Sequence, residues 1–133
     1  MARRLLVVDD DADLLAMLRD FFEKKGFDVL LAVDGMRAMD IVRQEPLDLV
    51  LLDMGLPVMD GLEVLRAIRG SRPRVPVLVI TASRDIDLAR RVLSCGANDF
   101  ITKPLDFGYL QYAAGVFSQA AQGPGFFPLK GIL

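Results

Sequence analysis

The sequence predicts an α/β fold with a doubly wound, five-stranded parallel sheet in the flavodoxin-like order 2-1-3-4-5 and five helices divided between its two faces. Short, nearly continuous runs of Val and Leu recur along the 133 residues, as in strands that are buried on both faces. Stretches with helical spacing of apolar residues separate these runs. Strict alternation of the two patterns implies right-handed crossovers, and the length fits one domain with this strand order.

Five apolar runs are the expected strands. In chain order they are Leu5–Val8, Val29–Val33, Leu47–Leu52, Val75–Ile80 and the less apolar Asp99–Thr102. In a sheet of this order, ligands bind at the carboxyl ends of the strands where the winding direction reverses, which is between the first and third strands.

Four apolar stripes predict the first four helices. The first stripe is Leu14, Leu15, Leu18, Phe21 and Phe22, capped by Asp11 or Asp13 and stopped at Gly26. The second is Ala38, Ile41 and Val42, ended by Pro46. The third is Leu62, Leu65 and Ile68, ended by Gly70 and Pro73. The fourth is Leu88, Val92 and Leu93, stopped at Gly96.

The fifth helix is expected to be unusually apolar. No charged residue occurs from Phe107 to Leu129, and one thin polar stripe contains Gln111, Gly115, Ser118 and Gln122. Such a helix covers the sheet and leaves an apolar flank, which a homodimer through the fourth helix, fifth strand and fifth helix would bury. We expect the domain to span residues 1–121. Residues 122–133 then form an apolar tail with a Gly-Pro-Gly break, which is the start of a linker, a segment that docks on the flank, or non-native sequence.

Composition excludes several classes of function. The chain has 16 Lys and Arg against 18 Asp and Glu, a net charge of −2, so we expect no direct binding of nucleic acid by this domain. It has no His and one Cys, Cys95, which excludes His-based catalysis and an internal disulfide. No signal peptide precedes the acids after Val8, and no apolar run reaches about 20 residues. We therefore expect a cytoplasmic protein without a membrane span.

Acidic residues follow two strands that we expect to be neighbours. The first strand runs into Asp9, Asp10 and Asp11, and the third runs into Asp53. The fold brings Asp9, Asp10 and Asp53 into one crevice, where like charges repel unless a cation neutralises them. Mg²⁺ prefers carboxylates, waters and phosphate oxygens as ligands. A single Asp in such a position is usually a helix cap, but two sets at the switch point predict a functional site.

Two further strand ends supply groups that suit a phosphoryl ligand. The fourth strand leads into Thr81, and the fifth leads into Lys103 and Pro104. A hydroxyl and an ammonium beside an acid cluster can together hold a dianionic phosphoryl group. Taken singly, Thr81 reads as a helix cap and Lys103 as a solvated lysine. Pro104 restricts Lys103 to an extended backbone, and a cis bond between the two is compatible with the sequence.

These segments resemble the receiver domain of two-component response regulators. The pieces LLVVDDD, DLVLLDMGLPVMDG, VLVITA and GANDFITKP occur in order, and the resemblance covers residues 3 to about 110. It implies that Asp53 is the phosphoacceptor and that Mg²⁺ (or Mn²⁺) is held by Asp10, Asp53 and the backbone carbonyl of Gly55. The resemblance also implies that Asp9 acts through a water and that Thr81 and Lys103 contact the phosphoryl oxygens.

The resemblance implies a switch, not a turnover enzyme. A sensor histidine kinase or phosphotransfer protein would supply the phosphoryl group from a phosphohistidine, and the acyl phosphate would hydrolyse slowly at the same site. Thr81 and Phe100 would then move and bias the surface of the fourth helix, fifth strand and fifth helix. Phe100 is equally consistent with a plain core aromatic. Gly55 departs from the family, which usually has a larger side chain there, and this predicts a shorter-lived phosphoryl state.

Three alternatives remain at this point. A small haloacid-dehalogenase-type phosphohydrolase would use an Asp-x-Asp after the first strand, which Asp9 and Asp11 match, but it leaves Asp53 and Lys103 without their pattern. A flavin-binding module would need a Gly-, Ser- and Thr-rich phosphate loop where this chain has three acids. The third alternative is a receiver-like interaction module that is not phosphorylated.

Overall fold

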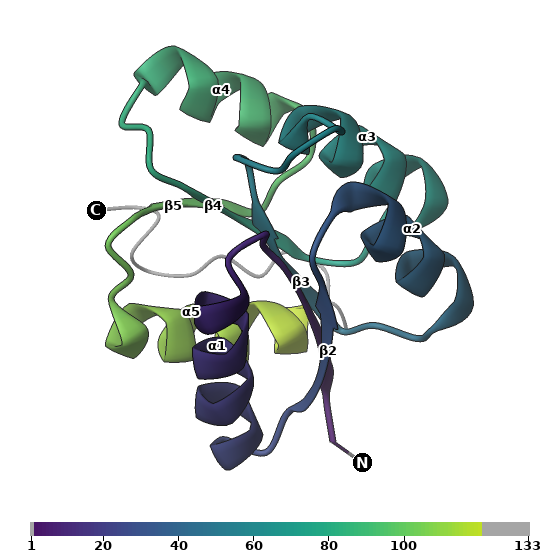
Figure 1. Cartoon of the computed structure of the whole chain (residues 1–133), viewed down its shortest axis with the longest axis vertical. Helices are drawn as coiled ribbons and strands as arrows, with labels where there is room; N and C mark the ends of the chain where they lie inside the picture. The colour runs from purple at the N-terminus through teal and green to yellow at the C-terminus, as the bar shows by residue number, and fades with distance from the viewer. Residues whose placement is uncertain (1, 121–133) are drawn as a thin grey trace.

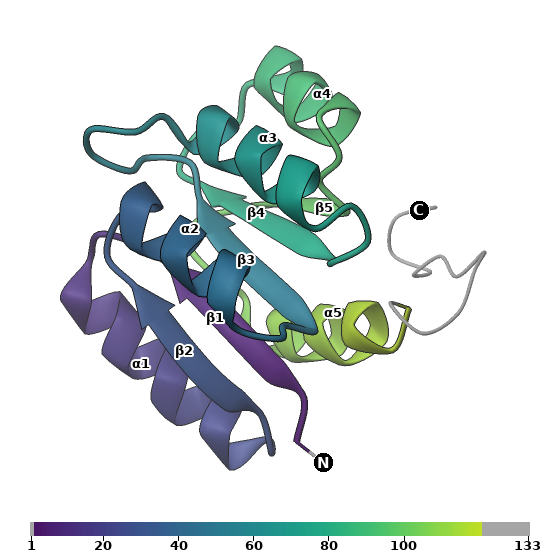
Figure 2. The ribbon, with the colours of Figure 1, turned by 90° about the vertical axis from the view of Figure 1, so that its right-hand side faces the viewer.

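We describe residues 2–120 of a computed structural model of the chain. The five strands are β1 (Arg4–Val8), β2 (Asp28–Ala32), β3 (Leu49–Asp53), β4 (Val77–Thr81) and β5 (Asp99–Thr102). They form one sheet in the order β2-β1-β3-β4-β5, and every neighbouring pair is parallel. Figure 1 shows this sheet between two layers of helices, and Figure 2 labels all five strands. This order confirms the predicted fold class and makes β1 and β3 neighbours at the point where the winding reverses.

Five helices connect and cover the strands. They are α1 (Ala12–Lys24), α2 (Gly35–Gln44), α3 (Gly61–Ser71), α4 (Ile86–Ser94) and α5 (Phe107–Ala120). α2, α3 and α4 lie on one face of the sheet, while α1 and α5 lie together on the other (Figure 2). Each face has its own apolar cluster because alternate strand residues point to opposite sides: Leu6 and Val8 contribute to one cluster, Leu5 and Val7 to the other.

An aspartate directly precedes each of the five helices of residues 2–120. The carboxylates of Asp11, Asp34, Asp60 and Asp85 accept hydrogen bonds from the first-turn N–H groups of α1 to α4. Asp106 does the same for α5, accepting from the N–H of Tyr109 at 3.1 Å. These bonds satisfy N–H groups that have no partner within the helix, and the negative charge suits the positive end of the helix dipole. Of the two predicted caps of α1, Asp11 is therefore the one that is used.

The structure corrects the sequence analysis in several places. Leu93, placed in the buried stripe of α4, is 46 % exposed, while Val92 beside it is fully buried. Ser118, placed on the polar stripe of α5, is fully buried and accepts a hydrogen bond from Arg3 at 3.0 Å. α3 continues past Gly70 to Ser71. β3 and β4 begin and end later than predicted, so Asp53 and Thr81 are the last residues of their strands.

The predicted tail, residues 122–133, lies outside the described residues, as does Gln122 of the polar stripe. None of the helices within residues 2–120 is long and apolar enough to cross a membrane.

Candidate functional site

Three carboxylates meet at the carboxyl ends of β1 and β3, as predicted. Asp9 and Asp10 follow β1, and Asp53 ends β3; one oxygen from each lies within 4.8 Å of the others. Asp9 and Asp53 are 1 % and 5 % exposed, whereas Asp10 is open to solvent. The backbone brings them together because Val8 pairs with Leu52 in the parallel register of β1 and β3.

The electrostatics of this cluster favour a bound cation. Burial raises the pKa of Asp53 above its usual value, and the nearby charge of Asp9 raises it further. The N–H of Gly55, which donates to Asp53 Oδ1 at 3.3 Å, and the Lys103 ammonium act in the opposite direction without cancelling these effects. Three close carboxylates, one of which (Asp10) is exposed to solvent, suit a hard divalent ion such as Mg²⁺, which also binds waters. The acidic residues present therefore fit the metal expected of this site.

Lys103 reaches into the same cluster from the end of β5. Its Nζ lies 3.4 Å from Asp9 Oδ2 and 3.7 Å from Asp53 Oδ1, and its side chain is 29 % exposed. The peptide bond between Lys103 and Pro104 is cis. Lys103 N–H donates to the carbonyl oxygen of Thr81 at 2.8 Å, so the chain beyond β5 stays beside the end of β4. An ammonium so placed offsets part of the negative charge of the cluster.

Thr81 ends β4 and is almost fully buried. Its Oγ1 accepts a hydrogen bond from the N–H of Ser83 at 3.0 Å, which orients the β4–α4 loop. Phe100, the candidate switch aromatic on β5, is half-buried and packs against the cluster beneath α2, α3 and α4. The two residues are held in adjacent strands by the register in which Val79 pairs with Phe100 and Thr81 with Thr102.

A close helix approach positions the loop that follows Asp53. Gly61, the first residue of α3, packs so tightly on this loop that a Cβ atom there would lie 2.6 Å from Met54 Cα. Gly55 differs, because a Cβ there would meet only the Asp53 carboxylate oxygens at 3.8 and 3.9 Å, an ordinary contact distance. Packing therefore requires a glycine at position 61, whereas Gly55 leaves space beside the Asp53 carboxylate.

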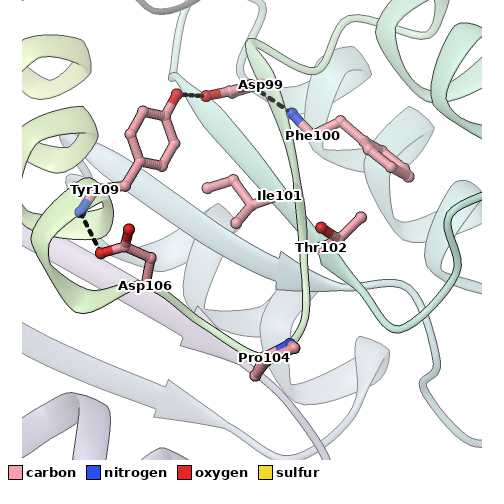
Figure 3. Close-up of a pocket in the computed structure, with 7 residues that line it drawn as sticks. All are labelled: Asp99, Phe100, Ile101, Thr102, Pro104, Asp106 and Tyr109. Carbon is pink, nitrogen blue, oxygen red and sulfur yellow. Dashed lines mark hydrogen bonds between the residues drawn. The ribbon is translucent and has the colours of Figure 1, made fainter.

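Sequence reasoning missed a link between β5 and α5. Asp99 accepts a hydrogen bond from the N–H of Phe100 at 2.8 Å and a second from the hydroxyl of Tyr109 (Figure 3). Burial and the Asp99 carboxylate raise the pKa of Tyr109. These residues line a groove of about 330 Å³ along β5 and the start of α5. The signal in the sequence was an Asp directly before the strand aromatic and a Tyr in the first turn of the next helix.

Taken together, the fold and site define a doubly wound α/β protein with an acidic site at the carboxyl ends of β1 and β3. The family model for the response regulator receiver domain matches residues 5–114, and the chain belongs to this family. Receiver domains bind Mg²⁺ through acidic residues and interact with histidine kinases or phosphotransfer proteins, and the acid cluster of this chain fits that role.

Relatives of known name support the same membership. The chain is 42 % identical over 107 residues to the transcriptional regulatory protein ZraR of Klebsiella oxytoca, covering 80 % of this chain and 24 % of that protein. It is 34 % identical to the sporulation initiation phosphotransferase F of Bacillus subtilis, covering 85 % of this chain and 91 % of that one. The chain thus spans about a quarter of the regulator it matches and nearly all of the phosphotransferase.

Solved structures agree with the fold. A CheY-like response regulator receiver domain from Methanospirillum hungatei superposes with a TM-score of 0.88 at 25 % identity, over 92 % of this chain and 98 % of that one. A receiver domain from Clostridium thermocellum gives a TM-score of 0.85 at 26 % identity, over 90 % and 97 % of the two chains. Family membership decides against the phosphohydrolase and flavin-binding alternatives.

Proposed function

We propose that Asp53 is phosphorylated in a Mg²⁺-dependent reaction and that this chain catalyses the transfer to itself. The observation that carries the proposal is the convergence of Asp9, Asp10 and Asp53 within 4.8 Å, with Lys103 Nζ 3.7 Å from Asp53 Oδ1. Asp10 and Asp53, with the Gly55 carbonyl, would hold the metal, and Asp9 would act through a water. When bound, Mg²⁺ supplies positive charge that offsets the charge on the transferring phosphoryl group.

The transfer uses the residues as follows. An Asp53 carboxylate oxygen attacks phosphorus, the bond between phosphorus and the phosphohistidine nitrogen of the donor breaks, and the imidazole leaves and takes up a proton. Lys103 and Thr81 contact the phosphoryl oxygens and stabilise their charge. In a separate hydrolysis step, water attacks phosphorus, the bond between phosphorus and the Asp53 oxygen breaks, and inorganic phosphate leaves, which restores the Asp53 carboxylate. Repeated turnover of an external substrate is not part of this scheme.

The test is the mass of the intact protein after incubation with acetyl phosphate and Mg²⁺. We expect the wild-type chain to gain one phosphoryl group, and we expect no gain without Mg²⁺ or in Asp53→Asn. If no adduct forms, beryllofluoride distinguishes rapid hydrolysis, which still allows the fluoride complex to bind, from a site that cannot be phosphorylated. Failure of both the adduct and metal binding would favour the interaction module that is not phosphorylated.

Gly55→Asn is expected to lengthen the lifetime of the phosphorylated state several-fold. The space beside Asp53 accepts a Cβ atom, so the amide would cover the acyl phosphate on a side that Gly55 leaves open to water. The measurement is the decay rate of the isolated phosphoprotein after the donor is removed, with Gly70→Asn as a control because a Cβ there has no neighbour within 4 Å. An unchanged decay rate in Gly55→Asn would contradict the prediction.

We infer that the output of the switch is read on α4, β5 and α5. Phosphorylation would draw Thr81 toward the phosphoryl group and change the packing of Phe100, which is on β5 beside β4 and packs on the face of the sheet that α4 covers. Ile86 and Leu93 on α4 and Tyr112 on α5 are 66 %, 46 % and 42 % exposed. This exposed apolar surface supports a homodimer through the same elements.

The proposed division of the chain into a domain of residues 1–121 and a tail follows from the Gly-Pro-Gly break in the sequence.

A further inference from the structure

The face of the molecule opposite α2, α3 and α4 carries an apolar groove between α1 and α5. It has a volume of about 330 Å³ and is lined by Met17, Asp20, Phe21, Lys24 and Phe107. The Phe21 and Phe107 rings contact each other with centroids 5.0 Å apart, and Met17 beside them is 54 % exposed. Figures 1 and 2 show α1 and α5 together on this face. The site described above does not use any of these five residues.

The two charged residues at the rim of this groove neutralise each other. Lys24 Nζ and Asp20 Oδ2 pair with each other at 3.1 Å, and both side chains remain largely exposed. An apolar segment can therefore cover Met17, Phe21 and Phe107 without burying an unpaired charge. The groove is thus suited to apolar and aromatic side chains.

The chain itself contains a segment of that chemistry. After α5, the sequence runs Gly123-Pro124-Gly125 and then Phe126-Phe127-Pro128-Leu129, with no charge before Lys130. Glycines adopt φ values of either sign, and a Pro-Gly pair favours a turn, so this segment can reverse the direction of the chain. Two adjacent phenylalanines, followed by Pro and Leu, then offer the side chains that the groove accommodates.

The chain that follows α5 is long enough to run back to the groove. α5 rises by 1.5 Å per residue, which places Phe107 about 20 Å from Ala120. An extended chain spans at most about 3.3 to 3.6 Å per residue, so Phe126 reaches that distance at full extension. Phe127 and Leu129 lie further along and reach the groove even when the turn takes up part of the length.

We propose that the segment Phe126–Leu129 docks within its own molecule into the groove between α1 and α5. α1 directly follows the loop of Asp9 to Asp11, and α5 follows Lys103 and Pro104. The docked segment therefore bridges the two helices whose preceding loops supply Asp10 and Lys103 to the phosphorylation site. It also covers this face against other proteins.

The test uses methyl NMR of the full chain labelled at its six methionines, with Met17 assigned from Met17→Leu. In the double variant Phe126→Ser/Phe127→Ser, we expect the Met17 methyl signal to shift because two aromatic rings leave its surroundings. Met36, which is 71 % exposed on α2 on the opposite face, should not shift. Lys130→Ser, which changes the same tail without removing an aromatic ring, should leave both signals in place.

A disulfide test then distinguishes docking of the segment within its own molecule from docking of the tail of a second copy. In a Cys95→Ala background, Met17→Cys/Phe127→Cys should form a disulfide within one chain at a rate that does not change on tenfold dilution, and Met36→Cys/Phe127→Cys should not. An unshifted Met17 signal, or equal rates in the two pairs, would overturn the proposal. A disulfide formed only between chains would also overturn it and assign the groove to the tail of a second copy.

Discussion

Lys103→Met is expected to lower the rate of self-phosphorylation by about 100- to 1,000-fold, the typical effect of removing one preorganised donor to a developing negative charge. Of the ion pairs among residues 2–120, the two that reach the acid cluster both involve Lys103, with Nζ 3.4 Å from Asp9 and 3.7 Å from Asp53. Methionine keeps the length and apolar stem of the side chain but removes the charge. The measurement is the rate of adduct formation with acetyl phosphate at saturating Mg²⁺.

Two further variants make this result specific to the position of the charge. Lys24→Met removes an ammonium from the exposed surface of α1, where it pairs with Asp20, and should leave the rate unchanged. Lys103→Arg restores the charge with a larger, planar group and should recover only part of the rate. A Lys103→Met protein that is phosphorylated at the wild-type rate would show that Lys103 has no part in the transfer.

Asp53→Asn is expected to raise the free energy of unfolding of the metal-free protein by about 1 to 3 kcal/mol at pH 7, the range for relieving a buried, poorly compensated polar group. The pKa of Asp53 is raised in the folded state, first by burial and then by Asp9. At a pH above this raised value, ionised Asp53 destabilises the folded state. As the pH falls from the raised pKa toward the ordinary value of 3.8, the folded protein takes up the proton more readily than the unfolded chain, so the penalty shrinks and is absent below that value.

The stability difference between Asp53→Asn and wild type should therefore be largest near neutral pH and should shrink on acidification. Denaturant unfolding across this pH range measures it, with Asp20→Asn as the control because Asp20 is an exposed carboxylate on α1. Adding Mg²⁺ should stabilise the wild type more than the variant, since a ligand that binds only the folded state shifts the unfolding equilibrium. An Asp53→Asn protein that is less stable at pH 7 would contradict the prediction.

Much of the fold and of the acid cluster could be predicted because both depend on local patterns. Buried parallel strands read as continuous apolar runs, and the topology alone brings Asp9, Asp10 and Asp53 to one edge of the sheet. The roles of the metal, Thr81 and Lys103 in the transfer stay predictions.

What could not be predicted depends on contacts between distant segments. Periodicity identifies an apolar face of α4 but does not say how the helix is turned against the sheet, so Leu93 was misplaced. Ser118 is fully buried and accepts a hydrogen bond from Arg3, which is 115 residues away in the chain. The Arg69 side chain likewise joins α3 to the loop before β5. It donates hydrogen bonds to the carbonyl oxygen of Gly96 at 2.8 Å and to Asn98 Oδ1 at 2.9 Å. A pattern within one element carries no information on such partners.

The short strand β5 has a consequence for how this domain behaves at high concentration. β5 lies at the edge of the sheet and has only four residues, and a bare edge of this kind can recruit the strand of another molecule. The Asp99 carboxylate accepts a hydrogen bond from the N–H of Phe100 and another from the hydroxyl of Tyr109 on α5. A charge and an occupied N–H at the open edge discourage intermolecular strand pairing and thus the growth of cross-β aggregates.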